Sequence, residues 1–320
     1  MGQAVMARLG NRSAGVRRIF QPGRPSRTPT SSTPYGFSGL LFLSPWLLGL
    51  LLLTTGPVLA ALALSFTRYD LFGSPEYVGL QNYRTMLGDA RLLSALRVTV
   101  VYVFLSVPLN LVFALAVAVA LNRRIGGLVW YRALFYLPSL LGGSAAIAIL
   151  WRQVFGRDGL FNAALALFGV TGQSWIANPG TSLYTLILLH VWQFGSPMVI
   201  FLAGLKQVPR ELYEAASLDG ATGLEQFRNV TLPLITPVIL FNLVLQIISS
   251  FQSFTPAYVV SGGTGGPVDS TLFYTLYIYQ EGFEHFRMGY ASALSWVLLL
   301  IIAVVTSLVF ATSKRWVHYS

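Results

Sequence analysis

A stripe of neutral polar side chains marks the apolar segment at residues 237–260. Asn242, Gln246, Ser249 and Ser253 follow one another at intervals of four, three and four residues. In a helix with 3.6 residues per turn, this spacing places all four on one face, within about 60°. Such amides and hydroxyls can pair with the hydroxyls of a neutral solute. They can equally bond one membrane helix to another, so both interpretations of the stripe stay open.

Aromatic rings near this stripe extend the candidate substrate site. Binding sites for small molecules combine aromatic surfaces with a few placed polar groups, and the flat face of a sugar ring suits such a surface. The nearby candidates in the sequence are Trp192, Phe194 and Phe254. Together with the polar stripe, they predict a site for a neutral, hydroxyl-bearing solute.

The sequence gives no indication that this chain catalyses a reaction or hydrolyses ATP by itself. Its only lysines are Lys206 and Lys314, and neither follows a glycine, which excludes a phosphate-binding loop of the type G-x-x-x-x-G-K-[ST]. The glycine-rich run at residues 261–267 lacks the lysine and is interpreted as a flexible external loop. Cysteine is absent, and no metal-ligand, Ser-His-Asp or paired-carboxylate grouping occurs. We therefore expect no enzyme, no metal site and no cofactor in this chain.

Transport driven by an ion gradient is also poorly supported. Carriers of that kind place ionisable residues within a span, whereas every Asp and Glu here is expected in a loop. His190 is the only titratable group expected well inside a span. A single buried histidine is more often a packing residue than a proton relay.

The most informative loop covers residues 208–237 and predicts two short helices with a sharp break. Pro209 suits the first helical position, where its missing N–H costs nothing. Glu211 and Glu214 follow in the first turns, where the helix dipole favours carboxylates. Gly220 can adopt the left-handed conformation that ends a helix.

The second helix of this loop has its own start and stop signals. Thr222 and Glu225 have the spacing of a capping box. Pro233 is expected to end this helix, and Pro237 to open the next apolar segment. The loop is acidic, which is unusual for the side of the membrane on which we place it below.

The elements that must position these residues are membrane helices. Of the 320 residues, 54% are hydrophobic and only 10% are charged, against roughly 25% charged in soluble domains. The net charge of +10 would suggest nucleic acid binding in a soluble protein, but the aliphatic content argues against that partner. Six runs have about the length that a bilayer requires; they are residues 39–66, 98–121, 133–150, 183–205, 237–260 and 291–311. The third is interrupted by Pro138, Gly142 and Gly143.

Basic residues predict the orientation of the six spans. The segment before the first span carries six arginines and no acid. The loop after the second span carries Arg123, Arg124 and Arg132, and the last tail carries Lys314 and Arg315. Short basic loops remain cytoplasmic, and six spans bring all three segments to the same side. We therefore expect both termini in the cytoplasm.

The first 38 residues are interpreted as a disordered cytoplasmic tail that enforces this orientation. They are polar and rich in Arg, Pro, Ser and Thr, and the apolar run that follows is too long for the core of a cleavable signal. An amphipathic targeting segment is the alternative. The expected organisation is a tail at 1–38, a first span with its external loop at 39–94, a permease core at 95–311 and a cytoplasmic tail at 312–320.

The acidic loop carries a resemblance to a known family. Its sequence EAASLDGATGLEQFRNVTLP resembles the EAA signature of binding-protein-dependent importer permeases. The positions that match the pattern are Glu214, Ala215, Ala216, Gly220, Val230, Leu232 and Pro233. Asp219, Ala221 and Phe227 also fit the carbohydrate branch. Further resemblance covers residues 131–162 and 262–283, so that the match extends over nearly the whole chain beyond the tail.

The resemblance implies an all-α integral membrane protein with the type I fold of ATP-binding-cassette importer permeases. It looks like the first, maltose-transporter-type permease of a sugar importer in a bacterial or archaeal cytoplasmic membrane. The first short helix would then be a coupling helix that contacts an ATPase. The implied partners are a second homologous permease, two ATP-binding subunits that use the ATP, and an extracytoplasmic solute-binding protein that delivers a carbohydrate. Maltose-type permeases bind sugar near the polar stripe, which favours the substrate interpretation slightly.

Two alternatives stay open. The chain could import another solute on the same scaffold, such as an amino acid, a polyamine or a phosphate ester. Cationic substrates would call for acids in the pathway, and none is found there. The second alternative is an ion-coupled secondary carrier with an EAA-like loop.

Overall fold

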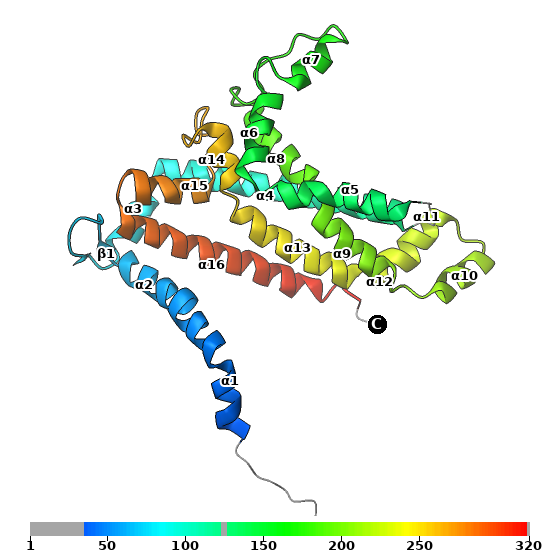
Figure 1. Cartoon of the computed structure of the whole chain (residues 1–320), viewed down its shortest axis with the longest axis horizontal. Coiled ribbons are helices and arrows are strands. Elements are labelled where there is room, and N and C mark those ends of the chain that lie inside the picture. Colours follow the sequence, from blue (N-terminus) through cyan, green and yellow to red (C-terminus); the bar gives the residue numbers. More distant parts are fainter. Residues whose placement is uncertain (1–34, 123–126, 319–320) are drawn as a thin grey trace, which may run out of the picture. The chain divides into compact units, whose positions relative to one another are not determined.

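The computed structural model describes residues 35–122 and 127–318, and these segments are mostly helical (Figure 1). The basic tail before residue 35, Arg123, Arg124 and Ser320 lie outside the described residues. The α-helices are α1 (Tyr35–Gly49), α2 (Gly56–Ser65), α3 (Gln81–Leu87), α4 (Ala90–Leu121), α5 (Leu128–Leu141), α6 (Ala145–Val154), α7 (Leu160–Ala166), α8 (Ser182–Trp192), α9 (Gly195–Leu205), α10 (Arg210–Leu218), α11 (Gly223–Gln226), α12 (Leu232–Leu234), α13 (Thr236–Phe251), α14 (Thr255–Ser261), α15 (Tyr274–Tyr279) and α16 (Met288–Ser313). Short π-helices are η1 (Leu50–Thr55), η2 (Phe227–Thr231) and η3 (Gln280–Glu284), and β1 (Thr67–Arg68) pairs with β2 (Glu76–Tyr77) in an antiparallel ribbon.

Packing divides the chain into two units, with the boundary between Thr54 and Thr55. In the first unit, most apolar side chains between residues 41 and 53 are exposed, as shown by Phe42 at 86% and Leu53 at 80%. Large exposed apolar side chains of this kind suit a lipid environment. The second unit holds the remaining helices and the candidate sites described below.

The expected spans are found with shifted ends. Four helical segments have the length and hydropathy of a membrane span: Leu41–Ser65, Ala90–Leu121, Thr236–Ser261 and Met288–Ser313. Two further candidates are bent pairs, α5 with α6 at 97° and α8 with α9 at 41°, so that the count reaches six when each pair forms one span. The third expected span, at 133–150, is therefore two helices that meet at the interruption already visible in the sequence. The division into a tail, a first span, a core and a second tail stays a prediction.

Helix α4 begins eight residues before the expected start because Asp89 caps it. The carboxylate of Asp89 accepts hydrogen bonds from the backbone amides of Arg91 and Leu92, both at 3.0 Å. Its other oxygen accepts the hydroxyls of Tyr277 and Tyr290, both at 2.6 Å. Burial raises the pKa of Asp89, but these hydrogen bonds outweigh burial and place the pKa below its usual value. The cap thus ties α4 to α15 and α16.

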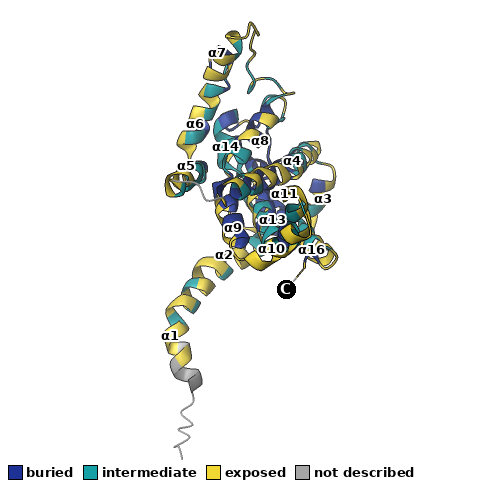
Figure 2. Cartoon of the chain, turned by 90° about the vertical axis from the view of Figure 1, so that its right-hand side faces the viewer, coloured by how far each residue is buried: buried dark blue, intermediate teal, exposed yellow. Residues whose placement is uncertain are grey.

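The core of the second unit surrounds α4, which packs against α8, α9 and α13 (Figure 2). Its buried face repeats at helical spacing and includes Tyr102, Val107, Ala114 and Ala118. The small side chains near its second half permit close approach of the neighbouring helices. Helix α16 packs against α2 and α13 on another side.

Hydrogen bonds join the bend between α5 and α6 to the bend between α8 and α9. Ser139 in α5 donates to the carbonyl of Gln193 at 2.7 Å, and the Gln193 amide donates to the carbonyl of Gly142 at 3.1 Å. A Cβ atom on Gly142 would clash with the side chain of Gln193, and one on Gly195 would lie 2.7 Å from the carbonyl oxygen of Phe135. Glycine is therefore required where these backbones meet.

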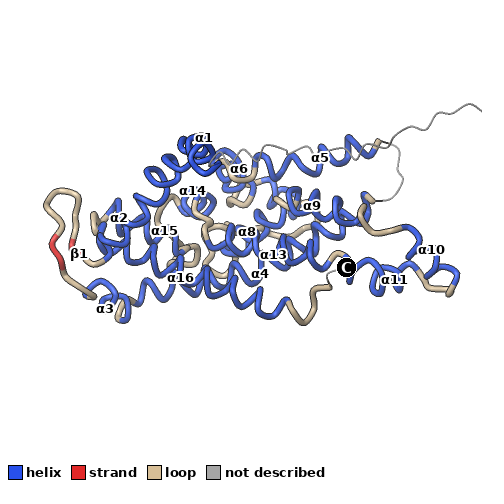
Figure 3. The backbone as a smooth tube through the Cα atoms, turned by 90° about the horizontal axis from the view of Figure 1, so that it is seen from below, coloured by secondary structure: helices blue, strands red, loops and turns tan. Residues whose placement is uncertain are grey.

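The acidic loop and the carboxyl-terminal segment lie at the same end of the second unit. Figures 1 and 3 place α10 and α11 near the end of the described chain, while β1 and α3 lie at the opposite end. The backbone amide of His318 donates to the hydroxyl of Thr236, the first residue of α13, at 3.0 Å. Helices α10 and α11 and the segment after α16 are therefore found at one end of the second unit.

Candidate functional site

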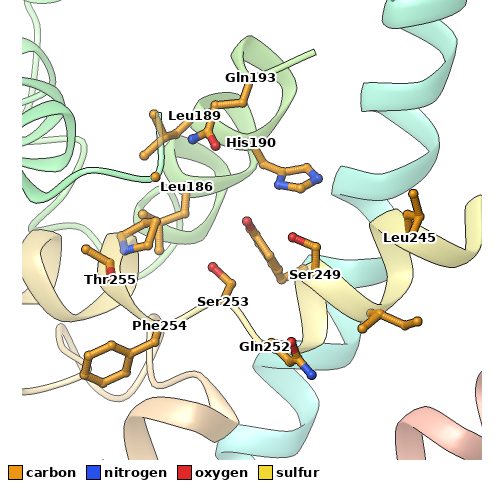
Figure 4. A pocket seen from close by; sticks show the side chains of 14 residues that line it. Leu186, Leu189, His190, Gln193, Leu245, Ser249, Gln252, Ser253, Phe254 and Thr255 are labelled. Atoms are coloured by element: carbon orange, nitrogen blue, oxygen red, sulfur yellow. The ribbon is translucent and has the colours of Figure 1, made fainter. Parts of the chain in front are cut away.

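A cavity of about 430 Å³ opens in the second unit where three helical interruptions meet. The interruptions are the breaks between α5 and α6, between α8 and α9, and between α13 and α14. The cavity is lined by Tyr102, Gly143, Leu186, Leu189, His190, Gln193, Leu245, Ile248, Ser249, Gln252, Ser253, Phe254, Thr255 and Pro256. In Figure 4, His190 from α8 faces Ser249 from the end of α13 and Ser253 from the break that follows α13. Hydroxyls, amides, one imidazole and aromatic rings are thus combined with apolar walls.

Three of the predicted substrate residues line this cavity: Ser249, Ser253 and Phe254. Ser249 belongs to the last turns of α13, and the other two lie in the break that follows it. Of the two serines, Ser249 is exposed and Ser253 is half-buried, and both border the cavity; a contact of either with substrate stays a prediction.

The other half of the stripe lies away from the cavity. Gln246 donates from its amide to the Oδ1 of Asn110 at 2.8 Å, and Asn110 in turn donates to the carbonyl of His190 at 2.7 Å. Asn242 is 1% exposed, and its Nδ2 has no hydrogen-bond partner among the described residues. Gln246 therefore joins α13 to α4 and, through Asn110, to α8, which favours the helix-bonding interpretation for this residue.

The two other aromatic candidates pack outside the cavity. Trp192 lies 5.9 Å from Trp151, measured between ring centroids. Phe194 is 5% exposed and packs edge-on against Phe113 at 4.8 Å. Neither ring is among the residues that line the cavity.

Sequence reasoning missed several cavity residues, among them Tyr102, Gln193, Gln252 and Thr255. His190, interpreted from the sequence as a packing residue, also lines the cavity, and its Nε2 lies 3.4 Å from the hydroxyl of Ser250. Gln252 lies three residues after Ser249, which is one of the helical intervals in the polar stripe. The same spacing argument could therefore have included Gln252. Tyr102 lines the cavity because α4 packs against distant helices, and no pattern in the sequence around Tyr102 indicates this.

The second candidate site is the acidic loop, whose first helix ends in a Schellman motif. Gly220 has φ = +81°, as its position in the sequence predicts. The amide of Ala221 bonds the carbonyl of Ala216 at 2.9 Å, and the amide of Gly220 bonds that of Ser217 at 3.1 Å. These two bonds satisfy the last carbonyls of α10 and reverse the chain sharply. Asp219 is the C-cap residue.

The capping box of the second helix is present as predicted. The amide of Glu225 donates to the Thr222 hydroxyl at 3.4 Å, and the Glu225 carboxylate accepts the Thr222 amide at 2.7 Å. This amide and the Thr222 hydroxyl lower the pKa of Glu225. The Gln226 amide further bridges to the hydroxyl of Ser217 at 3.0 Å and to the carbonyl of Ala221 at 3.1 Å. Helices α10 and α11 are thus held as one unit.

Two prolines of the loop differ from their expected positions. Pro209 is the N-cap of α10 with an extended ψ of 137°, so that the helix begins one residue later, at Arg210. Pro233 does not end the second helix but lies at the start of α12, after the π-helix η2. Proline cannot bond the carbonyl four residues back, and the wider turns of η2 precede it. The helical run containing Val230, Leu232 and Pro233 therefore continues as far as Leu234.

The outer face of the loop is available to a partner. Glu214, Ala215, Asp219 and Gly220 are exposed, whereas Ala216 is half-buried. Three leucines protrude from the same pair of helices: Leu212 at 41%, Leu218 at 90% and Leu224 at 76% exposure. Exposed leucines beside carboxylates on a capped helix pair are typical of a docking surface. The inner side is held by Tyr213, whose hydroxyl lies 2.8 Å from that of Thr231.

Comparison with known proteins supplies the context for both sites. The family model described as "Binding-protein-dependent transport system inner membrane component" matches residues 91–318. The chain is 52% identical over 284 residues to YesP of Bacillus subtilis (strain 168), described as a probable ABC transporter permease protein; the match covers 88% of this chain and 92% of the relative. It is 35% identical over 274 residues to AraP of the same organism, an arabinooligosaccharides transport system permease protein, over 83% of this chain and 85% of the relative.

A solved structure shares the fold. A chain of the bacterial alginate ABC transporter, in complex with an alginate pentasaccharide-bound periplasmic protein, superimposes with a TM-score of 0.77 at 20% sequence identity. The match covers 88% of this chain and 96% of the other. The expected type I importer permease architecture is therefore confirmed.

Proposed function

We propose that this chain, which belongs to the family of binding-protein-dependent transport system inner membrane components, forms the translocation path of an ATP-driven carbohydrate importer. The observation that carries the proposal is the cavity at the meeting point of three broken spans. Transporters place substrate sites near such interruptions, where freed backbone groups and side chains line a cavity.

The lining of the cavity suits a sugar. Ser249, Ser253, Gln193 and Gln252 offer donors and acceptors, and no Asp, Glu, Lys or Arg is among the lining residues. A hydroxyl-rich neutral solute can exchange its water for these groups without leaving a charge unpaired. Of the proteins compared above, AraP is named for arabinooligosaccharides and the solved transporter for alginate, and both of these substrates are carbohydrates.

The exposed helix pair α10–α11 is proposed as the contact with a cytoplasmic ATPase. Its capped turns and bridging hydrogen bonds make it a rigid element, which can pass on a displacement instead of absorbing it. The chain has no phosphate-binding loop of its own, so ATP is used by partner subunits and no cofactor is held here. Glu214, Asp219 and the exposed leucines form the proposed contact surface.

The complete importer is proposed to contain a second homologous permease, two ATP-binding subunits and an extracytoplasmic solute-binding protein. In the proposed orientation, the loop α10–α11 and both termini are cytoplasmic, in keeping with the basic tails. Closure of the ATPases would move the loop, and the two permeases would then expose the cavity to alternate sides.

Reconstitution tests this function. The chain, its second permease and its ATPases are placed in liposomes, and uptake of radiolabelled arabinotriose, maltose and an alginate trisaccharide is measured with the binding protein. ATP-dependent uptake of at least one sugar that persists after the ion gradient is collapsed supports the proposal.

Three other outcomes would contradict the proposal or one of its parts. Uptake that disappears with the ion gradient while ATP is maintained identifies an ion-coupled carrier. Uptake of glycerol 3-phosphate, but of no sugar, identifies a permease for phosphate esters. Transport by the chain without ATPases would reject the proposed role of α10–α11.

A further inference from the structure

Four aromatic rings form a continuous series that starts at the cavity. Phe254 lies at the rim of the cavity, on the side away from His190 (Figure 4). Its ring stacks on Tyr258 with 5.3 Å between centroids and 28° between planes, and it lies 5.3 Å from the ring of Tyr279. Tyr258 and Tyr279 meet edge to face at 5.4 Å. Tyr279 then stacks on Phe283 at 5.3 Å and 28°.

The series leads away from the proposed cytoplasmic end. Tyr258 belongs to α14, Tyr279 is the last residue of α15, and Phe283 lies in η3. Helices α14 and α15 lie toward the end of the unit opposite α10 and α11 (Figure 1). In the proposed orientation, the rings therefore connect the external end with the cavity.

These rings are accessible, which distinguishes them from core aromatics. Phe254, Tyr258 and Tyr279 are half-buried, and Phe283 is 58% exposed. By contrast, Phe273 and Tyr274 on the same segment are 1% exposed. The exposed surface of Phe283 leaves its ring accessible to a ligand at the outer end of the series.

The backbone around the series holds the rings in place. The amide of Gly263 bonds the carbonyl of Tyr258 at 2.7 Å, and a Cβ on Gly263 would lie 3.2 Å from the Tyr258 ring. The Gln280 amide bonds the carbonyl of Gly263 at 2.7 Å, which links α14 to η3. Rings fixed in this way bind a ligand with little further loss of conformational freedom.

We propose that Phe254, Tyr258, Tyr279 and Phe283 form an aromatic track that binds the apolar faces of sugar rings between the external surface and the cavity. The inference rests on the proposed function and adds to it a route of entry. Sugar rings carry C–H groups on one face, and these pack favourably on aromatic faces. Packing on an aromatic face depends only weakly on the orientation of the sugar. A sugar could therefore pass from one ring to the next without being bound too tightly at any one of them.

The proposed track can be tested by measuring how much sugar is transported per ATP hydrolysed. The assembled importer is reconstituted with saturating binding protein loaded with the sugar of the panel above that shows the highest uptake. Sugar transported per ATP hydrolysed is compared for the wild type, Phe283→Leu and Phe283→Trp. We expect Phe283→Leu to lower this ratio about two- to tenfold, which corresponds to the loss of one aromatic contact. Phe283→Trp keeps a ring and should retain the wild-type ratio.

Phe286→Leu is the matched control. Phe286 is an exposed aromatic residue three positions further on, but it packs against Phe72 at 5.3 Å and lies outside the series. The track predicts that this variant transports normally and that the ATPase rate stimulated by the loaded binding protein is unchanged in all three variants.

Three results would overturn the inference. An unchanged ratio in Phe283→Leu would show that the outer ring is not used. Equal loss in Phe283→Leu and Phe283→Trp, or a fall in ATPase stimulation together with transport, would assign Phe283 to docking of the binding protein. If the wild type transports no sugar at all, the proposed function fails first, and the track fails with it.

Discussion

Substitution of Gly220 tests whether the sharp turn after α10 is needed for coupling to an ATPase. This residue has φ = +81°, a conformation that costs a residue with a Cβ about 1–2 kcal/mol. No atom lies within 4 Å of a Cβ built on Gly220, so a Cβ there would meet no steric clash. The cost assigned to Gly220→Val is therefore that of its positive φ in the turn.

The expected effect follows from that free energy. A loss of about 1–2 kcal/mol lowers the population of the native turn relative to alternatives by a factor of about 5 to 30. The affinity of the permease pair for the ATPase should fall by up to this factor, because only the native turn presents α10 and α11 together. Gly220→Asn should cost less, since asparagine tolerates the left-handed conformation.

The assay is a titration of purified ATPase against the permease pair in nanodiscs, with coupled transport measured in parallel. Gly223→Val is the matched control, because Gly223 lies three residues further on, has no positive φ and also has no atom within 4 Å of its Cβ. A Kd for Gly220→Val within twofold of that for Gly223→Val, with normal transport, would refute the role of this turn.

Further predictions concern the loop, the cavity and the topology. Glu214→Ala should weaken ATPase association or uncouple hydrolysis from uptake while membrane insertion survives; normal transport argues against the docking surface. Gln246→Ala leaves the Oδ1 of Asn110 without its donor, so it should lower stability by about 1–3 kcal/mol, read as a lower thermal unfolding temperature. Gln252→Ala removes a cavity amide and should reduce sugar uptake with basal ATPase unchanged; equal uptake would remove it from the site. A single cysteine at Ser320 should resist an impermeant reagent in intact cells, and labelling would contradict a cytoplasmic terminus.

Local signals in the sequence predicted the loop well. Thr222 and Glu225 are three residues apart and bond within a single turn, so their pairing depends on little outside that turn. The same holds for Gly220, whose conformation closes a helix through bonds to Ala216 and Ser217. Pro233 was misplaced because a π-helix has no comparable local signal and the continued helical run depends on packing.

The cavity was predicted only in part because it is assembled from distant segments. The helical period predicted that Ser249 and Ser253 share a face, and both border the cavity, but the partner of Gln246 is 136 residues away. Whether an amide lines a cavity or joins two helices depends on which helix lies opposite it. Likewise, Gln193 reaches the site because it bonds Gly142, 51 residues earlier. Such contacts follow from the packing of α5 against α9 and not from spacing within one span.

Helix α13 connects the two candidate sites through an unbroken run of the chain. At one end it follows η2 and α12, and the Tyr213 hydroxyl of α10 contacts Thr231 in that run. At the other end, Ser249 and the residues after Phe251 line the cavity. Because the buried bond between Gln246 and Asn110 joins α13 to α4, a displacement of α10 that moves α13 must also move α4 or break that bond. Breaking it would leave buried polar groups unpaired, at a cost of about 1–3 kcal/mol. Joint movement of α4 and α13 is therefore favoured, and it would carry Tyr102 and Ser249, which line the same cavity, as one body.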